Sequence, residues 1–299
     1  MADRLTIDAT DLRKRYGAVD ALCGLALGVP AGSIYGFLGR NGAGKTTTLK
    51  VLLGMARPDA GEARVFGLDA TKEAASVDIR RRTAFVSEEK DLYDYMTVDE
   101  MIHFTSSFYP RWRKDLAARY RRTFDLPGDR KGKALSRGTR TKLALLLALC
   151  RGAELLILDE PTSGLDPAVS EEVLQALVSY VDSAETTVFF SSHQIAEVDQ
   201  IADHVTIVDR GRAIVQGALD DVRARYRSIQ LVFDGDAPAV TFRAPGVVRA
   251  WREHRVLTVL SSAGADEIVD EARGLNPVSV AVTPLTLKDI FLETVMKEK

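Results

Sequence analysis

The sequence predicts an α/β protein built on a mostly parallel sheet, followed by a small α+β domain. Three observations predict this arrangement. A glycine-rich segment at 39–46 separates an apolar run from a helix-like run. A second apolar run at 155–158 ends in two acids, and from about Ser228 onward short apolar runs alternate with Asp, Gly and Pro. We therefore expect a first domain over residues 1–220 and a second over residues 228–299.

The first elements are expected to form an antiparallel layer, followed by a strand of the buried sheet. Residues 5–12 and 21–29 alternate apolar and polar side chains, as antiparallel strands do. Residues 33–38 form an apolar run typical of a buried strand, and residues 47–53 are typical of a helix that ends at Gly54. The first domain should therefore contain a mixed sheet.

The segment between that strand and that helix fits the pattern G-x-x-x-x-G-K-[ST], a phosphate-binding loop. Its glycines let backbone N–H groups converge on phosphates without Cβ clashes, and the helix N-terminus adds a positive dipole. Lys45 can then reach the β- and γ-phosphates, and the Thr46 hydroxyl can ligate Mg²⁺. The predicted nucleotide-binding residues of the loop are Gly39, Arg40, Asn41, Gly42, Ala43, Gly44, Lys45, Thr46 and Thr47.

The two acids after the second apolar run complete the predicted catalytic centre. The run is continuous, as expected of a central parallel strand that is buried on both faces. Ligands bind at the carboxyl ends of such strands, so Asp159 and Glu160 should emerge beside the phosphates. Asp159 is expected to hold the Mg²⁺ shell, and Glu160 to polarise the attacking water as a general base. A strand that ends in a helix-capping Asp is the structural alternative.

The remaining elements follow from the same patterns. A helical subdomain is expected over about residues 90–150, beginning with a capping box at Thr97 and Glu100. After His193, a helix and two short strands about a glycine turn should close the first domain near Gly217. In the second domain we expect strands at 229–233, 240–242, 247–251, 256–260 and 278–282, and helices at 265–273 and 287–297. Apolar residues at helical spacing in the last helix should form a buried face; they are Leu287, Ile290, Phe291 and Val295.

With these motifs in place, the chain resembles the ATP-binding subunits of ABC transporters, of the exporter-type branch. The resemblance covers roughly residues 4 to 218 and includes five further segments in the family's order. They are the aromatic Tyr16, the loop residue Glu88, the signature motif 135–139 (Leu-Ser-Arg-Gly-Thr), the D-loop 163–166 and the switch histidine His193.

The resemblance implies a role for each matched residue. Tyr16 would stack on adenine, although surface packing is the alternative, and His193 would bond the γ-phosphate unless it is a structural histidine. Ser136, Arg137 and Gly138 would meet the ATP held by a second ATPase subunit in a head-to-tail dimer. Asp166 would act across the same interface, but it also fits the N-cap of a helix that begins at Pro167.

Two positions depart from the family pattern. Glu88 stands where most members carry glutamine, so an anion that accepts but cannot donate would lie near the metal. Arg137 replaces the first glycine of the signature motif, while Ser136 and Gly138 are kept. We interpret both departures as marks of a subfamily, with Glu88 as a third candidate metal ligand beside Thr46 and Asp159.

Composition fits an ATPase of the cytoplasm. The 299 residues carry a formal net charge of -2, so we expect no nucleic-acid partner, which would call for a basic stripe. Neither cysteine, Cys23 or Cys150, lies in metal-ligand spacing, which favours a packing role in a reduced compartment. We expect no signal peptide and no membrane span. The resemblance then implies a protein on the cytoplasmic face of the membrane.

The motifs predict an ATP-hydrolysing protein, and the resemblance implies a subunit that dimerises around two ATP molecules and powers a separate transmembrane permease. Export is the expected direction, and the dimer could be a homodimer or a heterodimer. The alternative function is a non-transport ATPase of the same class that acts on ribosomes or DNA. This sequence does not identify the transported cargo, because the permease would select it.

Overall fold

The computed structural model describes residues 4–184 and 186–296. The chain divides into two compact units, Met1–Gln216 and Gly217–Lys299, which we call the N-terminal unit and the C-terminal unit. The interval between the two expected domains, residues 221–227, is largely occupied by a helix, α8 (Leu219–Arg225). Among the described residues, no helix is both long and apolar enough to cross a membrane.

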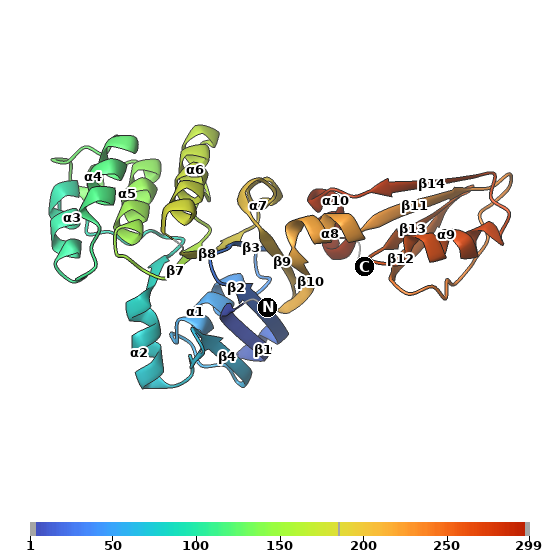
Figure 1. Cartoon of the computed structure of the whole chain (residues 1–299), viewed down its shortest axis with the longest axis horizontal. Coiled ribbons are helices and arrows are strands. Elements are labelled where there is room, and N and C mark those ends of the chain that lie inside the picture. Colours follow the sequence, from blue (N-terminus) through green and yellow to red (C-terminus); the bar gives the residue numbers. More distant parts are fainter. Residues whose placement is uncertain (1–3, 185, 297–299) are drawn as a thin grey trace. The chain divides into compact units, whose positions relative to one another are not determined.

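An antiparallel sheet opens the N-terminal unit, as expected (Figure 1). Alternation of buried and exposed side chains along its first strand places Ile7 and Ala9 on the core side, and a register shift after Ala9 brings Leu12 to the same side. The first strand pairs with the second and fourth in antiparallel register. In spatial order the sheet consists of β2 (Val19–Pro30), β1 (Leu5–Tyr16), β4 (Ala60–Val65) and β5 (Leu68–Asp69).

A six-stranded sheet forms the centre of the N-terminal unit. Its middle strands are entirely buried because they are covered on both faces, which explains their continuous apolar runs. Pairing is parallel among five of its strands, those at residues 34–39, 83–86, 155–159, 187–192 and 204–209, so their carboxyl ends lie at the same edge of the sheet. The order is β10 (Arg212–Ala218), β9 (His204–Asp209), β3 (Ile34–Gly39), β8 (Thr187–Ser192), β7 (Leu155–Asp159) and β6 (Thr83–Val86).

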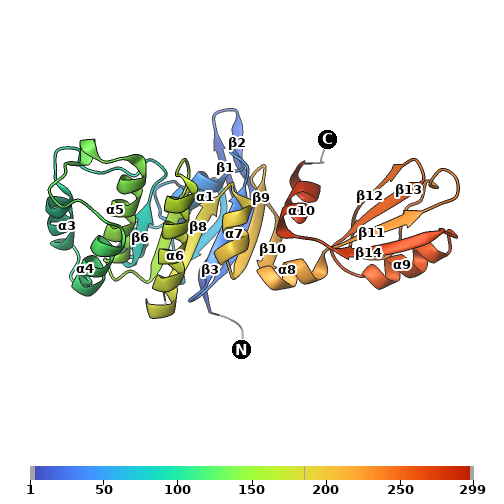
Figure 2. The ribbon, with the colours of Figure 1, turned by 90° about the horizontal axis from the view of Figure 1, so that it is seen from above.

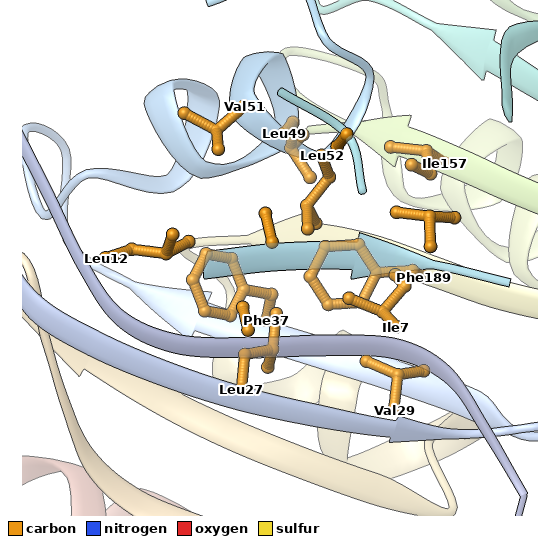
Figure 3. Close-up of a cluster of buried hydrophobic side chains, with 14 of the residues drawn as sticks. Ile7, Leu12, Leu27, Val29, Phe37, Leu49, Val51, Leu52, Ile157 and Phe189 are labelled. Atoms are coloured by element: carbon orange, nitrogen blue, oxygen red, sulfur yellow. The ribbon is translucent and has the colours of Figure 1, made fainter. Parts of the chain in front are cut away.

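The main core of the N-terminal unit joins these two sheets to the first helix (Figure 3). Phe37 and Phe189 lie at its centre with ring centroids 5.4 Å apart. Ile7 and Leu27 of the antiparallel sheet pack on one side and Leu49 on the other, each at most 2% exposed. This packing holds the strand that precedes the phosphate-binding loop against the helix that follows it.

Helices surround the parallel sheet. The expected helical subdomain consists of three separate helices, α3, α4 and α5, which gather beside α6 in both views (Figures 1 and 2). The capping box at Thr97 is formed, with Glu100 accepting from the Thr97 N–H at 2.7 Å. The helices are α1 (Lys45–Leu52), α2 (Glu73–Arg82), α3 (Val98–Ser106), α4 (Lys114–Thr123), α5 (Arg137–Leu149), α6 (Pro167–Ala184) and α7 (Ile195–Ile201), with a 3₁₀ turn at Gly132–Ala134.

The C-terminal unit contains an antiparallel sheet with a helix on one face. The sheet order is β12 (Val247–Glu253), β13 (Val256–Ser261), β11 (Arg227–Val232) and β14 (Ser279–Pro284). Helix α9 (Ala265–Arg273) packs against β11 and buries Ile268 and Ala272 in the unit's core (Figure 2). Helix α10 (Leu287–Phe291) follows β14, and the expected apolar face is confirmed, since Leu287, Ile290, Phe291 and Val295 are all buried.

Two expectations for the C-terminal unit are wrong. Residues 240–242 form a loop and no strand, and the two residues that follow them, Arg243 and Ala244, donate their N–H groups to the Glu271 carboxylate. The last helix is α-helical only as far as Phe291 and continues as a π-helical turn over Leu292–Met296. Lys297, the expected end of that helix, lies outside the described residues.

Candidate active site

A cavity of about 410 Å³ lies where the third and seventh strands end, with the loop after β3 and the acid after β7 in its lining. It brings together nine of the residues predicted to surround a nucleotide. These are Tyr16, Asn41, Gly42, Gly44, Lys45, Thr46, Thr47, Glu88 and Glu160, and Val19 and Ala21 complete the lining. Gly39, Arg40 and Ala43 belong to the same loop but do not line the cavity.

The phosphate-binding loop has the backbone that its glycines predict. Gly44 has a φ of 103°, and a Cβ there would lie 2.5 Å from the carbonyl oxygen of Ala21, so only glycine fits. The Lys45 ammonium is 7% exposed and donates to the carbonyl oxygens of Gly39 at 2.7 Å and Arg40 at 3.2 Å. Main-chain oxygens of the loop therefore hold the Lys45 side chain in the lining of the cavity.

Asp159, at the end of β7, is held by a hydroxyl on each side. Thr46 Oγ1 donates to Asp159 Oδ2 at 2.9 Å, and Ser191 Oγ donates to Oδ1 at 2.6 Å. The parallel pairing of β7 with β8 sets Asp159 directly opposite Ser191. The predicted pair of Thr46 and Asp159 is thus in contact, although they are 113 residues apart in sequence.

Glu160 occupies the centre of the predicted catalytic group. One carboxylate oxygen, Oε1, lies 3.1 Å from Lys45 Nζ, and the other, Oε2, lies 2.8 Å from His193 Nδ1. The Glu160 side chain is 6% exposed, whereas His193 is 41% exposed and so remains open to solvent. The structure therefore brings together Lys45, Glu160 and His193, the three residues predicted to be catalytic.

The residues present fit a magnesium ion that is shared with a substrate. Among the described residues, no group of three or more His, Cys, Asp or Glu side chains is gathered so that it could hold a metal by itself. Mg²⁺ instead prefers one or two carboxylates together with substrate phosphates and water. The Thr46 hydroxyl and the Asp159 carboxylate are hard oxygen donors in contact with each other, which suits that mode of binding. Glu88 lines the same cavity, and its part as a third ligand stays a prediction.

Tyr16 precedes the phosphate-binding loop in sequence, whereas the two acids follow it, yet Tyr16 and Glu160 line the same cavity. It is 48% exposed, and the Lys14 ammonium lies 5.3 Å from its ring centroid. A partly exposed aromatic ring on a cavity wall offers stacking area to a flat base. This position fits either interpretation given to Tyr16, because the ring is on the surface as well as in the cavity.

The signature and D-loop residues lie outside the cavity lining. Ser136 is the N-cap of α5 and accepts from the Thr139 N–H at 3.2 Å, and Arg137 next to it is exposed. A Cβ on Gly138 would touch Val169 at 3.3 Å. Asp166 accepts from the Val169 N–H at 3.0 Å, so its predicted capping of α6 is confirmed. Within one chain these residues therefore serve the ends of two helices.

Sequence reasoning missed two residues of the site. Ser191 bonds the Asp159 carboxylate and also accepts from the Glu160 N–H at 3.0 Å. Its position, a hydroxyl at the end of a buried strand that neighbours the acidic strand, could have indicated it. Lys90 is buried beneath the two acids and donates to the Glu160 carbonyl oxygen at 3.0 Å. No pattern in the sequence marks Lys90, because it stands in a run of four charged residues that is typical of an exposed loop.

Comparison with known sequences gives a family and close relatives. The family described as ABC transporter matches residues 22–163, and one described as an AAA domain, putative AbiEii toxin, Type IV TA system, matches residues 133–199. The chain is 31% identical to the bacitracin transport ATP-binding protein BcrA of Bacillus licheniformis, over 97% of each chain. It is 37% identical to the daunorubicin/doxorubicin resistance ATP-binding protein DrrA of Streptomyces peucetius, over 74% of this chain and 68% of that one.

Solved structures show the same fold. An ATP-binding subunit of an ABC transporter superposes with a TM-score of 0.65 at 26% identity, covering 74% of this chain and 92% of that chain. The bacterial ABC transporter cassette MJ0796, in its dimeric structure, superposes with a TM-score of 0.64 at 22% identity, over 71% of this chain and 98% of that one. At that identity the likeness to MJ0796 concerns the fold alone.

Proposed function

The chain belongs to the family of ABC transporter ATP-binding proteins, and from that premise we propose that it hydrolyses Mg-ATP to power a separate transmembrane permease in export. The observation that carries the proposal is the position of Glu160, which is ion-paired with Lys45 and hydrogen-bonded to His193 at the wall of a cavity that the phosphate-binding loop lines. BcrA is named as a bacitracin transport ATP-binding protein and DrrA as a drug-resistance ATP-binding protein, which favours this function over the alternative of an ATPase acting on ribosomes or DNA.

In the proposed mechanism the chain's own residues bind, orient and move a proton. Backbone N–H groups of the loop and the Lys45 ammonium bind the β- and γ-phosphates, which requires Lys45 to exchange its contact with Glu160 for one with phosphate. Glu160 then accepts the proton of the attacking water as that water bonds to the γ-phosphorus and the bond to the β–γ bridging oxygen breaks. The products are ADP and inorganic phosphate.

Two further residues are assigned to orientation. His193 is bonded to Glu160 at 2.8 Å and partly exposed, so it can hold the carboxylate and also reach a phosphate oxygen. Ser191 fixes Asp159 by donating to its carboxylate and fixes Glu160 by accepting its N–H.

Thr46 and Asp159 would hold Mg²⁺, with Glu88 as the third candidate ligand. The ion would supply positive charge to neutralise the phosphate oxygens.

The proposed assembly contains two ATPase subunits, identical or different. Ser136, Arg137 and Gly138 lie outside the cavity of their own chain, so they are free to meet ATP bound by a second subunit. Asp166, which caps α6 within the chain, would lie at the same interface. The permease partner would place the assembly on the cytoplasmic face of the membrane. The names of BcrA and DrrA, in bacitracin transport and in drug resistance, support export as the direction.

The substitution Glu160→Gln tests this function in the full-length protein. It preserves volume but removes the base, so we expect the rate of phosphate release to fall about 100-fold or more while ATP still binds. ATP that is bound but not hydrolysed should hold two subunits together, which light scattering would detect as a dimer. Glu62→Gln is the matched control, because the Glu62 side chain is 73% exposed and outside the site. Near-normal turnover in the Glu160→Gln protein would contradict the assignment of the base.

A further inference from the structure

Lys90 is a buried lysine with no role in the mechanism described so far. It stands in the loop between β6 and α3, two residues after Glu88, and is 7% exposed. Among the described residues, its ammonium donates only to main-chain oxygens, to the carbonyl of Glu160 at 3.0 Å and that of Asp159 at 3.4 Å. A buried lysine costs free energy unless its charge is compensated, so its retention calls for an explanation.

The carbonyl that accepts from Lys90 belongs to an unusual stretch of main chain. Glu160 has a φ of 47°, in the left-handed region that non-glycine residues rarely adopt. Lys90 itself has a φ of 52°, in the turn that its N–H closes on the carbonyl of Ser87 at 3.3 Å. Two left-handed residues thus meet through one buried hydrogen bond. Such conformations cost free energy and persist where the surroundings hold them.

Charges around Lys90 compensate its own in part. Three carboxylates, those of Glu88, Asp159 and Glu160, act on the ammonium and favour its charged form, while the Arg137 guanidinium opposes it. Burial is the largest influence and lowers the pKa of Lys90 to about 8 from the ordinary value of 10.5. Lys90 is therefore the cation that lies among the acids of the hydrolytic centre and that also belongs to the loop carrying Glu88.

We propose that Lys90 is a positioning residue for hydrolysis: its ammonium fixes the left-handed main chain of Glu160, and so aims the carboxylate, while it ties the loop 87–90 to the acidic strand. This inference rests on the proposed function, because it assumes that Glu160 is the base. It follows that Lys90 acts on turnover rather than on ATP binding, since its hydrogen bonds go to the strand that carries the acids and not to the phosphate-binding loop.

The test compares steady-state ATP hydrolysis of three full-length variants. Lys90→Met removes the charge and the donors at similar length, and Lys90→Gln leaves a neutral donor. We expect kcat to fall about 10- to 100-fold in both, the range that a small misplacement of a catalytic group produces, with an unchanged KM for ATP. Lys90→Arg keeps a charged donor and should recover most of the lost turnover. Lys133→Met is the control, because Lys133 is an exposed lysine of the helical subdomain.

The outcomes separate this proposal from the proposed function. A kcat for Lys90→Met and Lys90→Gln within about twofold of wild type would overturn it, as would a raised KM with unchanged kcat. So would a lowered melting temperature with normal turnover per folded molecule, because that result indicates a structural role alone. If Lys90→Met does not fold, the pair Lys90→Gln and Lys90→Arg decides the matter. Absence of hydrolysis by the wild-type chain, measured beside Glu160→Gln, would instead overturn both proposals.

Discussion

The two units of this chain use the same kinds of element for different purposes. In the N-terminal unit, completely buried strands end in polar side chains that bond one another, as Asp159 does with Thr46 and Ser191. In the C-terminal unit the edge strand β14 is exposed along its whole length, and the polar contacts close turns and cap helices, as Thr286 does with Asp289. Reactive groups gather where strand ends are buried, because burial and neighbouring charges are what hold such groups in place.

The comparison implies that replacing one residue of the N-terminal unit lowers the affinity for ATP more than removing the whole C-terminal unit does. Lys45→Ala removes about two charge-assisted hydrogen bonds to phosphate, so we expect ATP affinity to fall about 100-fold. A chain that stops after Ala218, the end of β10, keeps every predicted nucleotide residue and should bind ATP as the full chain does. Equilibrium binding of a fluorescent ATP analogue measures both. Loss of binding in the shortened chain would show that the units are one functional body.

The second prediction concerns whether the units unfold separately. Leu155 and Leu231 are both buried strand leucines with 0% exposure, one in each unit. Truncating either to alanine should destabilise its unit by about 2–5 kcal/mol. We expect Leu155→Ala to lower one calorimetric transition and Leu231→Ala another, with ATP hydrolysis reduced only by the first.

Two exposed residues serve as controls for the leucines. Leu5→Ala and Val282→Ala remove apolar atoms at sites that are 40% and 45% exposed, so each should shift its transition far less. A single transition that moves equally in the Leu155 and Leu231 variants would show that the two units unfold as one.

A smaller effect is expected at two matched helix caps. Thr97 begins α3 in the N-terminal unit and Thr286 begins α10 in the C-terminal unit, each in a complete capping box. Replacing either threonine by alanine should cost about 1 kcal/mol, because an N–H of the first turn loses its acceptor. Urea unfolding of each variant against its Thr→Ser counterpart, which keeps the hydroxyl, isolates that loss. A cost confined to one unit would mean that the other cap is replaced by water.

The smallest expected effect is a difference in reactivity between the two cysteine thiols, which reports on opening of the N-terminal unit only. Both cysteines, Cys23 and Cys150, belong to the N-terminal unit. Cys150 is completely buried, and burial raises its thiol pKa to about 12, so almost no thiolate is present at pH 8. We expect Ellman's reagent at pH 8 to modify Cys23 and to reach Cys150 only when the N-terminal unit opens. Rapid labelling of both in the folded protein would contradict this.

The sequence was sufficient for those features that short patterns determine. The phosphate-binding loop, the buried acidic strand and helix α9, which spans the expected 265–273, each depend on residues that are neighbours in sequence. The expected strand at 240–242 is a loop, and a distant carboxylate, that of Glu271, accepts the N–H groups of the two residues that follow it. Tertiary contacts of this kind override local preference.

The sequence predicted those site residues that belong to recognisable motifs, and it did not predict the contacts between them. Lys45, Asp159 and Glu160 follow from spacing, but the contact of His193 with Glu160 depends on how two strands lie side by side. Lys90 could not be predicted, because its burial comes from the way a charged loop folds under the end of β7. The roles proposed for Ser136 and Gly138 involve a second subunit, which one sequence does not describe.

The left-handed main chain of Glu160 has a consequence for how this chain can evolve. A glycine at position 160 would relieve a conformational cost of about 1–3 kcal/mol and would make folding easier. Selection for a stable fold alone would therefore tend to replace this glutamate, whereas selection for ATP turnover would keep it if it is the base proposed above. A mutational library sorted once for thermal stability and once for ATP hydrolysis should rank the substitutions at this position in opposite orders.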